Sequence, residues 1–207
     1  MVPNYNLGLR LGNAPRIDET DFVGREVELE QLRTWLTPRP KRQNVVALYG
    51  LGGMGKTQLG IQFARRSIDT YTSIFWLNAQ DESTLKAGLA GLAAQVMGEQ
   101  KSASAYDPHE EERMVQQVRE WFSRPDNDGW LMLYDNYDHP LIPGITSTTS
   151  YDIRNYFPYR GHGSILITTR SPRLGFAKQL PVKKLNLNQS LSILTTRSGR
   201  EITGGKE

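Results

Sequence analysis

Short apolar runs alternate along the chain with segments whose apolar residues recur every three or four positions. The runs at residues 44–49, 73–79, 129–135 and 163–170 are rich in β-branched and aromatic residues, which is typical of buried strands. A shorter run at residues 180–185 indicates a last strand. Because helical segments separate these runs, the pattern predicts an α/β fold of three layers with a mostly parallel five-stranded sheet.

The helical segments are marked by apolar residues that share one face. In the first of them, residues 26–36, Leu29, Leu32 and Leu36 recur at helical spacing, and the Pro-Arg-Pro that begins at Pro38 ends it. Further helices are expected at residues 58–64, from residue 82 onwards, at 110–123 and at 188–197, with a short one at 152–157.

A phosphate-binding motif lies between the first strand and the second helix. Residues 50–57 (GLGGMGKT) match G-x-x-x-x-G-K-[ST] at every fixed position. The glycines allow the backbone N–H groups to turn inward around phosphate, and the helix that follows adds the positive end of its dipole. Lys56 would then reach the β- and γ-phosphates, and Thr57 would offer a hydroxyl to Mg²⁺. The alternative, a Gly-rich turn that ends in Lys-Thr by coincidence, does not account for the strand and the helix on either side.

The strand at residues 129–135 ends in an acidic residue, Asp135. In phosphate-loop NTPases an acid at the tip of such a strand holds Mg²⁺. A strand followed by Asp is a weak signal by itself, and Asp135 could simply begin a turn. Its place about eighty residues after a complete phosphate loop favours the metal role.

The strand at residues 163–170 ends in Thr168, Thr169 and Arg170. A guanidinium is always charged, and its fork of N–H donors suits the oxygens of a terminal phosphate. The alternative for Arg170 is an ion pair on the surface. If the strand is parallel to the other two, its tip lies at the same edge of the sheet as the phosphate loop.

Composition narrows the class of protein. The chain has 207 residues, 38% of them hydrophobic, with a formal net charge of +3 and no cysteine. No apolar run has the length of a membrane span, and no signal peptide is visible, so we expect a cytoplasmic protein without a membrane partner. The basic residues occur in small groups, not in one stripe, which makes nucleic acid an unexpected partner. The three histidines lack metal-ligand spacing.

The motifs together resemble one known family. The segment Phe-Val-Gly-Arg-Glu that begins at Phe22, the phosphate loop, the Phe-Trp-Leu-Asn that begins at Phe75 and the strand that ends at Arg170 are similar to the NB-ARC nucleotide-binding domain. That domain belongs to the STAND P-loop NTPases, and the form here is close to that of fungal NOD-like receptors. The resemblance covers residues 22–198.

This resemblance implies roles that the residues alone do not. It implies that Phe22, Val23 and Arg25 lie on the adenine and ribose side of a nucleotide, and that Arg170 senses the γ-phosphate. It also implies that the strand ending at Arg170 lies between the strands of the phosphate loop and of Asp135. We therefore expect a lead-in at residues 1–20 without regular structure, an NB-ARC-type domain at 21–198 and a tail at 199–207, with the family's ARC region absent.

The chain departs from the family beside Asp135. Many members carry a second acid directly after the first, which helps to position or deprotonate the attacking water. Here that position is Asn136, and Asp138 follows two residues later. An amide can orient water but cannot take its proton, so we expect weak hydrolysis, with Asp138 as a candidate acid.

The resemblance implies a molecular switch. ADP would hold the parent protein closed, and exchange for ATP with Mg²⁺ would favour an open form that self-associates and signals in innate immunity or programmed cell death. The fragment alone is expected to be monomeric. The residues predicted to bind nucleotide are Phe22, Val23, Arg25, Gly52, Gly53, Met54, Gly55, Lys56, Thr57 and Gln58. Catalytic roles are predicted for Lys56, Asp135, Asp138 and Arg170, and Mg²⁺ ligation for Thr57 and Asp135.

Other functions remain open at this point. A turnover ATPase of the AAA+ type would need a strong base beside Asp135 and an arginine finger from a neighbouring subunit. A STAND transcription regulator would need a DNA-binding module outside these residues. A degenerate scaffold would bind no nucleotide, and substitution of Lys56 would then change nothing.

Overall fold

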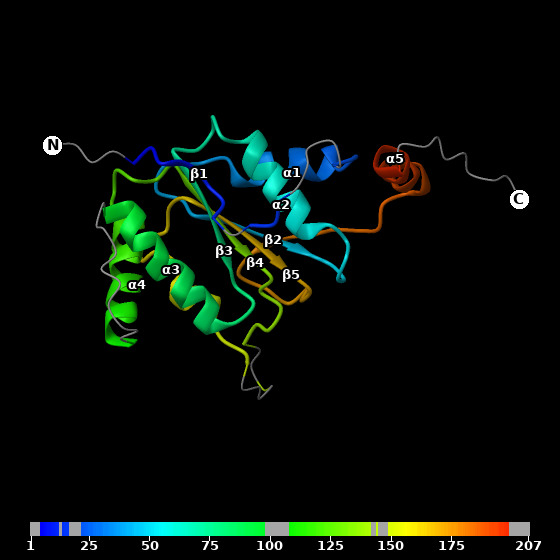
Figure 1. Ribbon diagram of the computed structural model, residues 1–207. Helices are drawn as coiled ribbons and strands as arrows, with labels where there is room; N and C mark the ends of the chain where they lie inside the picture. The colour runs from blue at the N-terminus through cyan, green and yellow to red at the C-terminus, as the bar shows by residue number, and fades with distance from the viewer. Residues whose placement is uncertain are drawn as a thin grey trace, which may run out of the picture.

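The computed structural model describes residues 5–12, 14–16, 22–97, 108–141, 144 and 149–198. In this part of the chain six strands form one sheet in the order β1-β3-β4-β5-β2-β6, and every neighbouring pair is parallel (Figure 1). The strands are β1 (Gly8–Arg10), β2 (Asn44–Tyr49), β3 (Ser73–Asn78), β4 (Trp130–Asp135), β5 (Ser164–Thr169) and β6 (Lys178–Pro181). The helices are α1 (Glu26–Leu36), α2 (Lys56–Arg66), α3 (Glu82–Met97), α4 (Pro108–Phe122), the 3₁₀ helix η2 (Ile153–Tyr156) and α5 (Leu187–Ser198).

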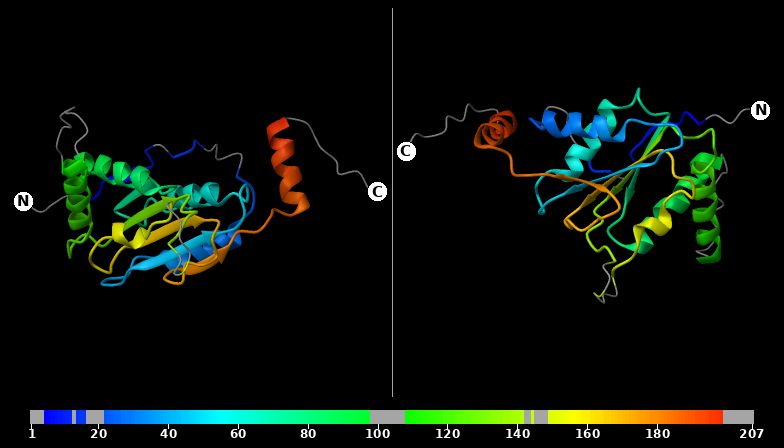
Figure 2. Two further views of the ribbon diagram at one scale, coloured as in Figure 1. Left: turned by 90° about the horizontal axis from the view of Figure 1, so that it is seen from below. Right: turned by 180° about the vertical axis from the view of Figure 1, so that it is seen from behind.

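Helices cover both faces of the sheet, which gives the three layers that the sequence predicted (Figures 1 and 2). Successive residues of a strand point to opposite faces, so β4 sends Leu131 and Leu133 towards α1 and α2, and Trp130 and Met132 towards α3 and α4. All four side chains are buried. Because both faces are covered, the strands appear in the sequence as continuous apolar runs.

The sheet has one strand more than predicted. Residues 8–10 lie in the lead-in that was expected to lack regular structure, yet they form β1 and pair with β3. Ser73 also holds the chain directly before β1, because its Oγ accepts from Leu7 N at 3.0 Å and donates to Tyr5 O at 2.6 Å. A three-residue strand shows no periodicity, and its partners lie more than sixty residues away, so the sequence pattern could not reveal it.

The last strand begins earlier than predicted. β6 spans Lys178–Pro181, whereas the apolar run had suggested residues 180–185. It pairs with β2 at the edge of the sheet, where Pro181, which has no N–H to donate, is tolerated. One more bond, from Val182 N to Tyr49 O at 2.8 Å, follows before the chain leaves the sheet towards α5.

The strand order places three functional tips at one edge of the sheet. β5 lies between β2 and β4, as expected, and Tyr49 of β2 is in register with Thr169 of β5. The carboxyl ends of the three strands therefore open into one crevice beside the start of α2. α5 stands off from the sheet in both figures, and none of its residues is fully buried (Figures 1 and 2).

Among the described helices, none combines the length and the apolar character that a transmembrane helix requires. The expected tail at residues 199–207 lies outside the described residues.

Candidate functional site

The phosphate loop connects β2 to α2 and contains three glycines at positive φ, of which Gly50 and Gly55 hold the fixed positions of the motif. Gly55 precedes α2 with φ of 82°, in the left-handed region. Gly50 has φ of 154°, and a Cβ there would lie 2.6 Å from the carbonyl oxygen of Val182. The motif glycines are thus required by backbone geometry, and by the close approach of the chain after β6.

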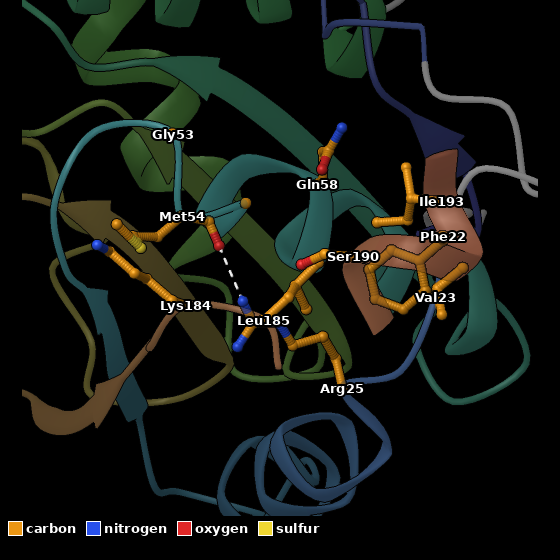
Figure 3. Close-up of a pocket in the computed structure, with 11 residues that line it drawn as sticks. Phe22, Val23, Arg25, Gly53, Met54, Gln58, Lys184, Leu185, Ser190 and Ile193 are labelled. Carbon is orange, nitrogen blue, oxygen red and sulfur yellow. Dashed lines mark hydrogen bonds between the residues drawn. The ribbon is translucent and has the colours of Figure 1, made fainter. Parts of the chain in front are cut away.

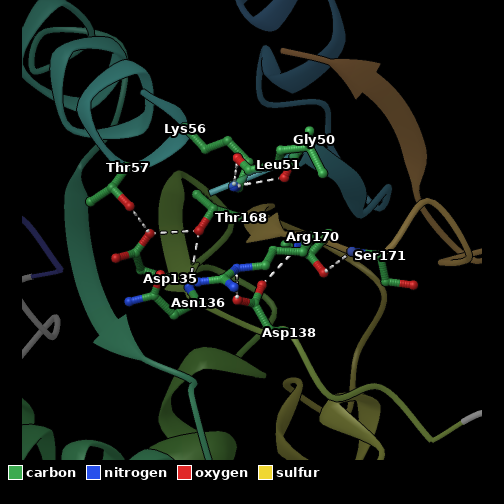
Figure 4. A network of polar contacts seen from close by, with 11 residues as sticks. Gly50, Leu51, Lys56, Thr57, Asp135, Asn136, Asp138, Thr168, Arg170 and Ser171 are labelled. Atoms are coloured by element: carbon green, nitrogen blue, oxygen red, sulfur yellow. Dashed lines mark hydrogen bonds and ion pairs between the residues drawn. The ribbon is translucent and has the colours of Figure 1, made fainter. Parts of the chain in front are cut away.

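Lys56 folds back over the loop that precedes it. Its Nζ donates to the carbonyl oxygens of Gly50 and Leu51 at 2.9 and 3.0 Å (Figure 4). Partial burial lowers the pKa of this ammonium, and the nearby Arg170 lowers it further, while Asp138 and Asp135 act in the opposite direction. The ammonium therefore lies among charged groups in a space where an anion would be stabilised.

Asp135 lies at the tip of β4 and is 2% exposed. Its Oδ1 accepts from Thr57 Oγ1 at 2.7 Å and from Thr168 Oγ1 at 2.6 Å, so the phosphate loop, β4 and β5 meet at one carboxylate oxygen (Figure 4). Burial raises the pKa of this carboxyl, although the two hydroxyl donors and Lys56 oppose that shift. Thr168 also accepts from Asn136 N at 2.9 Å, which makes it the link between the two strand tips.

Thr57 and Asp135 fit the oxygen ligands that Mg²⁺ prefers. Mg²⁺ in nucleotide sites is commonly bound through one or two protein oxygens together with phosphate oxygens and waters. The described residues contain no group of three or more His, Cys, Asp or Glu that could hold a metal ion by themselves. The geometry thus suits a metal that enters with a nucleotide.

Arg170 and Asp138 form an ion pair beside the loop. Arg170 Nε lies 2.8 Å from Asp138 Oδ2, and Arg170 N donates to Asp138 Oδ1 at 2.7 Å (Figure 4). The guanidinium carbon lies 3.6 Å from the position that a Cβ on Gly52 would take. Asn136, with φ of 66°, adopts the left-handed conformation that Asn tolerates better than most residues. A pocket of about 310 Å³ lies here, and its lining includes Asn136, Asp138 and Arg170 together with Lys56 and Thr57.

A second pocket, of about 420 Å³, lies beside the phosphate loop (Figure 3). Its walls come from the segment before α1, from the loop itself, from the stretch after β6 and from α5. The lining residues are Phe22, Val23, Arg25, Gly53, Met54, Gly55, Gln58, Lys184, Leu185, Ser190 and Ile193. The pocket is mixed in character, with an aromatic ring and aliphatic side chains facing polar groups.

Arg25 connects three parts of this second pocket. It is 8% exposed, and its Nη2 donates to Met54 O at 3.1 Å and to Lys183 O at 2.6 Å, while Nη1 contacts Glu28 at 2.9 Å. The guanidinium therefore joins the entry of α1 to the phosphate loop and to the chain after β6. Figure 3 shows the bond to Met54 at the base of the pocket.

The two pockets adjoin at the phosphate loop, because Gly53, Gly55 and Gln58 line both. The structure brings together all the residues that the sequence predicted to bind nucleotide, to act in catalysis or to hold Mg²⁺. The base-side pocket (the 420 Å³ pocket) holds the residues assigned to the adenine side, and the phosphate-side pocket (the 310 Å³ pocket) holds Lys56, Thr57, Asp138 and Arg170. Asp135 lies directly behind Thr57.

Sequence reasoning missed the contributions of Thr168 and of α5. Thr168 lies within the Thr-Thr-Arg pattern, and its place one residue from the tip of a buried strand was the available signal. Ser190 and Ile193 carried no local signal, because their place beside the loop depends on how the chain turns after β6.

Comparisons with known proteins agree with this fold. The chain is 27% identical over 199 residues to a nucleotide-binding leucine-rich repeat (NLR)-like protein of Hyaloscypha variabilis, a match that covers 89% of this chain and 19% of that protein. It is 31% identical over 99 residues to an uncharacterized WD repeat-containing protein of a Nostoc species, covering 44% of this chain and 8% of that one. The chain thus spans less than a fifth of the length of either relative.

The crystal structure of Cdc6p from Pyrobaculum aerophilum has the same fold, with a TM-score of 0.57 and 13% sequence identity over 88% of this chain and 54% of that one. No protein-family model matches the chain. The chain therefore has the P-loop NTPase fold, and it is homologous over most of its length to a fungal NLR-like protein.

Proposed function

We propose that this chain is an NB-ARC-type domain that binds ADP or ATP with Mg²⁺ and acts as the nucleotide-controlled switch of a longer STAND protein of the NOD-like receptor kind. The observation that carries this proposal is that two pockets of different character adjoin at the phosphate loop. One pocket offers cations and N–H groups to phosphate, and the other offers apolar and aromatic surface to a base.

The phosphate-side pocket supplies the parts that phosphoryl recognition needs. The β-phosphate would lie against the loop N–H groups at the start of α2, and Lys56 would exchange its two carbonyl acceptors for phosphate oxygens. Thr57 and Asp135 would hold Mg²⁺, which neutralises charge on the phosphates when bound. Arg170 would contact the third phosphate of ATP.

The base-side pocket suits a flat, weakly polar ligand. Phe22, Val23 and Ile193 provide apolar contact, and Arg25 fixes the walls relative to the loop. Since α5 forms part of this wall, a nucleotide bound here would contact an element that is otherwise little buried. A change in the position of α5 would in turn change nucleotide affinity, which is the reciprocity that a switch requires.

Two features support slow hydrolysis or none. Asn136 offers an amide where a base is needed, and the Asp138 carboxylate is already bound by the guanidinium and the N–H of Arg170. A nucleotide that is turned over slowly can hold a state for long times. The kinship with an NLR-like protein supports a role in nucleotide-dependent self-association and signalling, in innate immunity or programmed cell death.

The proposal is tested by measuring binding of ADP, ATP and GDP to the purified chain in Mg²⁺ by calorimetry, together with the thermal shift each produces. We expect both adenine nucleotides to bind and to raise Tm. Lys56→Ala should lower the affinity by roughly tenfold or more, because a charge-assisted contact to phosphate is lost. Lys86→Ala, which removes a cation paired with Glu112 away from both pockets, is the matched control.

Equal affinity of the wild type and Lys56→Ala for ADP would contradict the proposal and favour a scaffold that does not use this loop. Rapid steady-state turnover of ATP would favour a turnover ATPase instead of a switch. Binding of duplex DNA by the full-length protein would favour a transcription regulator.

A further inference from the structure

The ion pair between Asp138 and Arg170 joins a carboxylate that is held by the main chain to a guanidinium that is largely exposed. Asp138 is held by the main chain on two sides, since its N–H donates to Asn136 O at 2.8 Å and its Oδ1 accepts from Arg170 N at 2.7 Å. Its side chain is 19% exposed. The Arg170 side chain is 66% exposed, and among the described residues its ion pair is with Asp138. The carboxylate therefore stays in place while the guanidinium is free to change partner.

Both groups face the space where a terminal phosphate would lie. They line the phosphate-side pocket together with Lys56, and the guanidinium lies against Gly52 of the loop. Burial lowers the pKa of Lys56, and the nearby charge of Asp138 opposes that shift while the charge of Arg170 adds to it. A third phosphate entering this volume would meet a guanidinium that already has an anionic partner.

We propose that Asp138 is a positioning residue that determines the preference between ADP and ATP: it holds Arg170 in an ion pair that the γ-phosphate must displace. The inference rests on the proposed nucleotide-binding function and refines it. ADP would leave the pair intact, because Lys56 and the loop serve the β-phosphate. ATP would gain the contact with Arg170 only at the expense of the contact between Arg170 and Asp138. The acid thus favours the diphosphate state, and it does so without taking part in proton transfer.

The substitution Asp138→Asn isolates this effect. The amide oxygen can still accept from Arg170 N, so the turn is preserved, while the ion pair with the guanidinium is lost. We expect the affinity for ATP to rise by about fivefold relative to the affinity for ADP, which is the scale of a largely exposed ion pair. The measurement is calorimetric titration of both nucleotides, with Mg²⁺, against the wild type and the variant.

The chain offers a closely matched control in Asp152. Its carboxylate also accepts from the backbone N and the guanidinium of one arginine, Arg154, at 3.0 and 2.6 Å. The exposed fractions are also similar, at 21% for Asp152 and 59% for Arg154. Asp152→Asn changes the net charge equally but lies outside both nucleotide pockets, so its ratio of ATP to ADP affinity should equal that of the wild type.

A double-mutant cycle separates the ion pair from simple repulsion between the carboxylate and phosphate. If Asp138 acts through Arg170, Asp138→Asn should have no effect on the ratio in an Arg170→Ala background. An equal rise in that background, or an unchanged ratio in the single variant while both nucleotides bind, would overturn the inference and leave the proposed function standing. Failure of both nucleotides to bind the wild type would overturn the proposed function, and the inference with it.

Discussion

At the scale of single residues, Asp135 combines burial with a titratable carboxyl. Its carboxyl is almost fully buried, and it accepts two hydroxyl donors on one oxygen. Burial without a full ion pair disfavours the charged form, which is why its pKa is raised. This environment supports the proposed role of Asp135 in holding Mg²⁺, because a bound cation would stabilise the buried carboxylate.

We predict that Asp135→Asn stabilises the nucleotide-free protein at neutral pH and weakens its Mg²⁺-dependent nucleotide binding. A raised carboxyl pKa means that the folded protein holds the proton more tightly than the unfolded chain does. The stability this provides is fully present below the unfolded pKa of about 3.9 and is lost as pH rises through the folded pKa. The Asp135→Asn variant has no carboxyl that ionises at this position, so it does not lose this stability as the pH rises. Its Tm should therefore exceed that of the wild type at pH 7.

Thermal unfolding of both proteins between pH 4 and pH 8 checks this prediction. The difference in Tm should shrink as the pH is lowered, because protonated Asp135 and Asn are both neutral. A variant that is less stable than the wild type at pH 7 without nucleotide would show that the hydrogen bonds of the charged form outweigh its burial.

At the scale of elements, the alignment of β5 beside β4 depends on one close approach. Gly163 precedes β5 with φ of 75°, and a Cβ at this position would lie 2.3 Å from the ring of Trp130. Trp130 begins β4, is fully buried and donates to Phe122 O at 3.1 Å. The glycine thus lets the strand that carries Thr168 and Arg170 begin directly against the strand that carries Asp135.

We predict that Gly163→Ala lowers the free energy of unfolding by about 3 kcal/mol, through overpacking against a rigid ring and through strain at positive φ. Gly161→Ala is the control, because a Cβ at Gly161 would meet no atom within 4 Å. Urea unfolding of the two variants gives the comparison. A loss below about 1 kcal/mol for Gly163→Ala would mean that Trp130 can move aside.

At the scale of the whole molecule, the base-side pocket is assembled from segments that lie far apart in the chain. Phe22 and Val23 precede α1, Met54 belongs to the phosphate loop, and Ile193 belongs to α5. Arg25 holds these parts together through the carbonyls of Met54 and Lys183. α5, none of whose residues is buried, therefore completes the wall of this pocket.

We predict that Ile193→Asp lowers the affinity for ADP and for ATP by the same factor, roughly tenfold, because the apolar contact proposed for the base is replaced by a charge. Leu194→Asp is the control, since Leu194 is 52% exposed and does not line the pocket. Calorimetric titration of both variants measures the effect. An effect on ATP alone would place Ile193 near the phosphates and contradict this arrangement.

The sequence alone determined the phosphate loop, the tips of the three central strands and the layers of helices around them. These features are encoded locally: a motif requires particular backbone angles, a buried strand requires an apolar run, and a helix requires its period. The order of β5 between β2 and β4 came from the resemblance to a family. All the residues predicted to bind nucleotide or to act in catalysis lie around the phosphate loop in the structure.

Only the tertiary structure decided how β1, α5 and the Asp138–Arg170 pair take part. Gly8–Arg10 forms β1 by pairing with the edge of β3. α5 lines the base-side pocket, and Arg25 bonds to the carbonyl of Lys183 in the segment that precedes this helix. Asp138 and Arg170 lie 32 positions apart in sequence and meet because two parallel strands end side by side. Each depends on contacts between distant residues, which no local pattern of polar and apolar positions records.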